Sequence, residues 1–74
     1  MNNLKRNNMT PKEEAKELYN KFYNIGTHYI IEVRKDGAKK AALIAVDEIL
    51  KVAFYAPNEI YEHYLQVKTK IEKL

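Results

Sequence analysis

The stretch Ala41–Phe54 reads AALIAVDEILKVAF and is the one long run of this chain that is dense in apolar residues. Its apolar positions recur at spacings of three and four, which is the period of an α-helix and not the period of two that a strand requires. They form two adjacent stripes, Ala42, Val46, Ile49 and Ala53 in the first and Leu43, Leu50 and Phe54 in the second. A narrow polar strip contains Asp47, Glu48 and Lys51. A helix that is apolar over most of its circumference is normally buried on most sides, so this segment predicts the centre of the fold.

The length of the chain limits how well such a helix can be covered. The sequence has 74 residues, enough for one small domain, and a domain of about 60 residues buries only about 60% of the surface that its unfolded chain exposes. Two short helices can cover two faces of the central helix, and we expect a second copy of the chain to cover the third. The sequence therefore predicts a homo-oligomer, with a monomeric three-helix bundle as the alternative. The expected interface residues are Leu43, Val46, Asp47, Leu50 and Phe54.

Two further helices are predicted on either side of the central one. Thr10-Pro11-Lys12-Glu13 carries an N-cap, a proline suited to the first helical position and the glutamate of a capping box, and Gly26 suits a C-terminal stop. These signals predict a helix over residues 11–25. A second helix is predicted over residues 58–73, with Asn58 as its N-cap. Its apolar seam consists of Ile60, Tyr64, Val67, Ile71 and Leu74. Residues 1–9 are predicted to be a flexible tail, and residues 10–74 a single helical domain.

The segment 27–36 is ambiguous in the sequence. It is rich in residues that favour strands, and Asp36-Gly37 is a turn signal. A single strand without a partner is unstable, so we expect an extended connector, with a short strand or the beginning of the next helix as alternatives. The central helix is then predicted over residues 38–55, with Asp36 or Gly37 as its cap. Together these segments predict an all-α, three-helix fold.

Composition narrows the classes of protein to which the chain can belong. It has no cysteine, which excludes a disulfide framework and a cysteine nucleophile, and it has only two glycines, which leaves no glycine-rich phosphate loop. Its first eight residues lack the apolar core of a secretory signal, and no apolar run approaches the roughly 20 residues that span a bilayer. Glu59 and His63 share a helix face, but we interpret them as part of a solvated charged face. The sequence predicts a cytoplasmic protein that is not an enzyme and needs no metal or cofactor.

One group of residues suggests a binding site. Arg34, Lys35, Lys39 and Lys40 are basic, and Tyr29 lies just upstream of them. If Lys39 and Lys40 lie in the first turn of the central helix, the free backbone N–H groups there could bind an anion, and Tyr29 could stack on a base. This hypothesis predicts a phosphate or nucleotide site that is repeated in each subunit. The alternative is a solvated basic loop, since short runs of charge are usually only surface.

Three blocks of the sequence resemble a family. TPKEEAKELYNKFY (10–23), KKAALIAVDEIL (39–50) and VKTKIEKL (67–74) are similar to segments of small uncharacterised proteins from phages and prophages of Bacteroidota bacteria. In those relatives the middle motif often has cysteine at the position of Ala41, and the last helix often has tryptophan near the position of Tyr64. The resemblance implies an all-helical phage accessory protein, located in the cytoplasm of the host bacterium. It implies no established activity.

Taken together, these features favour a non-enzymatic binding protein. We expect it to act against host defence by sequestering a small anionic ligand, such as a nucleotide signal, between its subunits. The first alternative is a protein-interaction module that docks onto a host or phage protein through its tyrosines. The second is nucleic-acid binding, which the mild net charge of +3 permits but does not favour.

Overall fold

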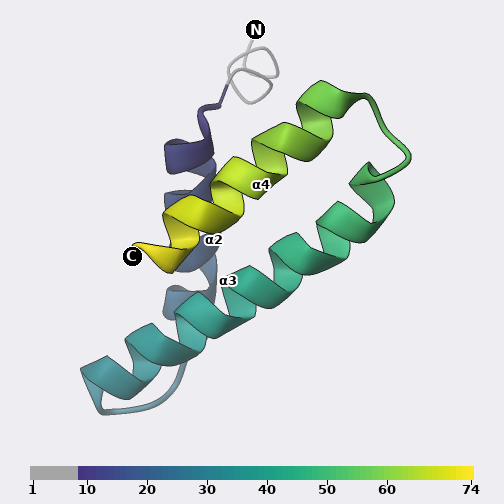
Figure 1. The fold of residues 1–74 in the computed structure, drawn as a ribbon. Helices are drawn as coiled ribbons and strands as arrows, with labels where there is room; N and C mark the ends of the chain where they lie inside the picture. Colours follow the sequence, from purple (N-terminus) through teal and green to yellow (C-terminus); the bar gives the residue numbers. More distant parts are fainter. Residues whose placement is uncertain (1–8) are drawn as a thin grey trace, which may run out of the picture.

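The fold consists of three α-helices, as the sequence predicts. The structure, a computed structural model, describes residues 9–74, and the helices are α2 (Pro11–Ile25), α3 (Ile31–Ala53) and α4 (Asn58–Glu72). No strand occurs in this part of the chain. Figure 1 shows α3 and α4 lying side by side as an antiparallel hairpin, with α2 crossing the hairpin at a steep angle. The predicted tail largely falls on residues 1–8, which lie outside the described residues.

Helix α2 has the predicted limits. The Thr10 hydroxyl accepts a hydrogen bond from the Glu13 N–H at 3.1 Å, and the Glu13 carboxylate accepts one from the Thr10 N–H at 2.9 Å. This completes the capping box. The hydrogen bonds with Thr10 lower the pKa of Glu13 because they favour its charged form. Gly26 ends the helix, and its N–H donates to the Tyr23 carbonyl at 3.2 Å.

The predicted start of the central helix was wrong by two turns. Residues 31–36 were expected in an extended connector, and Asp36 or Gly37 was expected to be the cap, yet both lie inside α3. The cause is a contact with α2: Arg34 Nε donates to the Tyr23 carbonyl at 2.8 Å, and its guanidinium lies 4.4 Å from the centre of the Tyr23 ring. An Asp36–Lys40 ion pair of 3.0 Å also spans Gly37 along the helix.

Smaller differences occur at the turn between α3 and α4. Helix α3 ends at Ala53 rather than at Tyr55, and the predicted cap of α4 was wrong by one residue, because Pro57 is the N-cap and Asn58 is already helical. Pro57 has a φ of −54° and a ψ of 147°, and its carbonyl accepts the N–H groups of Ile60 and Tyr61 at 3.0 and 3.4 Å. A proline can take this position because an N-cap needs no N–H donor of its own for the helix.

The core lies where the three helices cross. Its buried side chains come from all three helices, and half-buried side chains surround them. The buried residues are Ala15, Ala42, Val46, Val67 and Ile71, and the surrounding ones are Leu18, Phe22, Leu43, Leu50 and Tyr64. The alanines contributed by α2 and α3 let these helices approach closely. Although α3 has 23 residues, no helix in residues 9–74 is both long and apolar enough to cross a bilayer.

Replacing Ile71 with valine tests this core. Ile71 is fully buried, so the lost methylene should lower the free energy of unfolding by about 0.5–1.5 kcal/mol. The same substitution at Ile25, which is exposed at the end of α2, should change it by less than about 0.5 kcal/mol. Urea denaturation followed by circular dichroism measures both. Equal effects at the two positions would contradict this description of the core.

Candidate functional site

The predicted basic cluster is not gathered into one site within a single chain. Because α3 begins at Ile31 and has about 3.6 residues per turn, Lys39 and Lys40 lie beyond its second turn, away from the free N–H groups. The premise that placed them in the first turn was therefore wrong. Arg34 is engaged by Tyr23, and it lies about 120° around the helix from Lys40. Tyr29 is 98% exposed in the turn that precedes α3.

The predicted interface residues lie in different environments. Val46 is fully buried in a cluster with Ala15 of α2 and Val67 of α4, so it has no surface to offer a partner. Leu43 and Leu50 are half-buried and pack against the core. Phe54 is 70% exposed and makes edge-on ring contacts with Tyr55 and Tyr61.

Asp47 forms an ion pair with Lys68 of α4, with its carboxylate oxygen 3.0 Å from Lys68 Nζ. The hydrogen bond and the charge of Asp47 raise the pKa of Lys68. Asp47 was predicted to lie in the interface between subunits, and the partner that it has here belongs to another helix of the same chain. This pair joins α3 to α4 at a half-exposed position.

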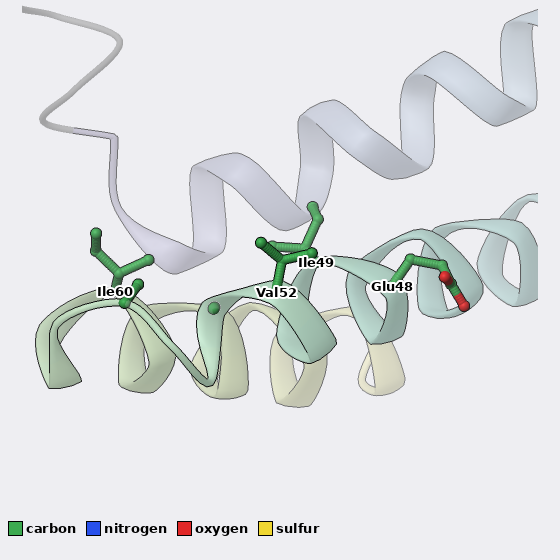
Figure 2. A pocket seen from close by; sticks show the side chains of 6 residues that line it. Glu48, Ile49, Val52 and Ile60 are labelled. Carbon is green, nitrogen blue, oxygen red and sulfur yellow. The ribbon is translucent and has the colours of Figure 1, made fainter.

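An open apolar groove lies at the corner where α3 turns into α4. It is lined by Glu48, Ile49, Val52, Ala53, Ala56 and Ile60 and has a volume of about 420 Å³. Figure 2 shows Ile49, Val52 and Ile60 on the same side of the hairpin. Val52 is 74% exposed, although valine is among the residues most often buried. The groove is open because the corner extends beyond the steep crossing of α2 (Figure 1).

A polar cluster joins α2 to α4 beside the core. Glu14 Oε1 lies 2.8 Å from His63 Nε2, and both side chains are largely buried. Burial of Tyr64, together with its hydrogen bond to Glu14 and the charge of Glu14, raises the pKa of Tyr64 to about 12. Glu14 therefore contacts two residues of α4. The interpretation of His63 as part of a solvated face was wrong, because its side chain is largely buried against Glu14. Within residues 9–74, no group of three or more His, Cys, Asp or Glu residues could hold a metal ion.

The sequence does contain a feature that could have predicted this cluster. Glu14 lies four residues before Leu18 and next to Ala15, so it borders the apolar face of α2 rather than the opposite, solvated face. An acid in that position needs a polar partner when the helix packs. His63 and Tyr64 are the polar and amphipathic residues that α4 places opposite it.

The Tyr64→Phe variant tests the cluster through its pH dependence. The pKa of a tyrosine is about 10 in an unfolded chain. Because the folded protein holds the Tyr64 proton to a higher pH, Tyr64 contributes stability that is fully present below about pH 10. This contribution is lost as the pH rises toward 12. The difference in the free energy of unfolding between wild type and Tyr64→Phe should thus be constant below about pH 10 and shrink above it. Tyr55→Phe is the control and should follow wild type. A constant difference up to about pH 11 would show that Tyr64 is not protected.

Comparisons with known proteins assign neither a family nor a function to this chain. Neither family models, nor curated proteins, nor solved structures gave a match to this chain.

Proposed function

We propose that this protein is a non-enzymatic accessory binding protein that acts as a homodimer, with the apolar corner groove as the contact between the two copies. The observation that supports this proposal is the open groove itself, in which Val52 and Ile60 are exposed and Ile49 is half-buried. Contiguous apolar surface on a soluble protein marks an interaction site more often than a free surface.

The apolar face of α3 continues beyond the groove. Ile44 is 63% exposed and lies eight residues before Val52, about 80° around the helix from it. A second copy of α3 packed alongside would cover the groove and Ile44 in one contact. Helices pack along such faces with their side-chain ridges in the grooves of the partner, so a second α3 fits this surface.

The charges beside the groove favour a second copy as the occupant. Glu48 lines the groove, and Lys51 follows three residues later on the same helix, where the two form an exposed ion pair of 2.9 Å. In an antiparallel pairing of two α3 helices about a two-fold axis, Glu48 of each copy can meet Lys51 of the other. Because the pair within one chain is solvated and therefore weak, exchanging it for pairs between copies costs little.

The dimer is the form in which we propose that the protein acts. The resemblance to phage accessory proteins suggests a role against host defence, by sequestering a ligand or by blocking a partner. A dimer presents every binding surface twice, which increases the strength with which a partner or a multivalent ligand is held.

A second candidate function is docking onto a host or phage protein. Phe54 and Tyr55, the latter 88% exposed, lie beside Tyr61 and line a shallow depression of about 560 Å³ together with Leu50 and the Asp47–Lys68 pair. Aromatic residues are enriched at protein interfaces and dominate their binding energy. This aromatic patch is distinct from the groove, so one copy could use both surfaces.

The Val52→Glu variant tests the dimer. A carboxylate placed in the contact would be desolvated without a partner, so it should weaken self-association by at least about tenfold. Analytical ultracentrifugation over a range of concentrations should show a dimer for wild type and a monomer for the variant. Val33→Glu is the matched control, since it makes the same change at an exposed valine of α3 outside the groove, and it should still form the dimer.

Other outcomes of this experiment reject the proposal. If wild type remains a monomer at every concentration, a second copy is not the occupant, and the groove is left for the helix of another protein. If both variants dissociate equally, net charge rather than the groove controls self-association.

A further inference from the structure

A second pocket, at the other end of the hairpin, is bordered by lysines. Lys12 and Lys16 come from the beginning of α2, and Lys70 and Lys73 come from the end of α4. Ala15 and Leu74 supply its apolar lining, and its volume is about 250 Å³. Residues 54 to 62 positions apart in the sequence line one pocket because the start of α2 crosses the end of α4.

These lysines have few counter-charges. Within residues 9–74, the lysines in ion pairs are Lys40, Lys51 and Lys68, and none of the four pocket lysines is among them. The nearby Glu13 carboxylate is engaged by the Thr10 N–H in the cap of α2. The side chains that line the pocket include four lysines and no carboxylate.

The helix dipoles explain the positions of only two of these four lysines. Cations at the end of a helix are favourable, which explains Lys70 and Lys73, but cations near the start of a helix are unfavourable. Lys12 is in the first turn of α2, and Lys16 follows one turn later. Their positions therefore oppose the local preference. An anion bound between the helices would stabilise all four lysines together.

We infer that this pocket binds a compact phosphate group that carries at least two negative charges. Lysine is a flexible point charge that binds phosphate oxygens without the fixed fork of arginine. The volume is below the usual 300–1,000 Å³ of small-molecule pockets, so the phosphate part of a ligand fits inside and a larger attached part would project outward. This inference gives the proposed binding function a ligand class and rests on that function, but it uses no residue of the groove.

Inorganic pyrophosphate is the probe that tests the inference. Titration of the isotope-labelled full chain, followed by amide resonances, should shift signals at the start of α2 and the end of α4. The double variant Lys16→Gln and Lys70→Gln should bind at least about tenfold more weakly, because two charged contacts are lost. The matched control, Lys21→Gln and Lys35→Gln, removes the same charge from exposed positions outside the pocket and should change the affinity by less than about twofold. Circular dichroism checks that both variants keep their helices.

Three results would contradict the inference. Equal weakening in the pocket variant and the control would show that net charge alone attracts the probe, and shifts confined to α3 would place anion binding elsewhere. Preferential binding of a short single-stranded oligonucleotide over pyrophosphate would replace the compact ligand with an extended polyanion. The same titration on the Val52→Glu variant distinguishes this inference from the proposed dimer. Unchanged pyrophosphate affinity in a monomeric variant would show that the pocket binds its ligand without dimerisation. Failure of one proposal is then not read as failure of the other.

Discussion

The structure depends on the steep crossing of α2 over the α3–α4 hairpin. The crossing brings Ala15 of α2 and Ala42 of α3 into one buried cluster with Val67 and Ile71 of α4. Small side chains at this point allow close approach, and the larger ones fill the space around it. Glu14 then joins α2 to α4 through His63 and Tyr64 at the edge of the same cluster. Without this contact the hairpin would expose one complete apolar side.

The same crossing decides which surfaces stay open. Helix α2 has 15 residues and α3 has 23, so one helix placed at a steep angle cannot cover the other along its length. The uncovered end of α3 forms the apolar groove beside Ile60, and the opposite end of the hairpin meets the start of α2 at the lysine pocket. One geometric constraint thus creates an apolar surface and a basic one at opposite ends of the domain. A protein that pairs through the first would keep the second free for a ligand.

Much of the fold could be predicted from local signals. The limits of α2 follow from Thr10, Pro11, Glu13 and Gly26, because capping groups act within a few residues of each other. The position of α4 follows from its apolar seam, to within one residue at each end. The start of α3 could not be predicted in this way. Asp36-Gly37 is a turn signal in isolation, and it is overridden by Arg34, whose partner Tyr23 lies eleven residues earlier on another helix.

For the candidate surfaces too, some properties follow from the sequence and others only from the packing of the helices. The sequence by itself determined that the chain is helical, that its centre is Ala41–Phe54 and that more apolar surface is available than one small domain readily covers, because these properties depend on spacing and composition. Only the tertiary structure decided which apolar residues are covered, burying Val46 and leaving Val52 exposed, since that depends on the angle at which helices pack. It also decided which basic residues lie near one another. The run from Arg34 to Lys40 is spread around a helix. Lys12 and Lys70 are far apart in the chain, yet they line one pocket because two helix ends cross.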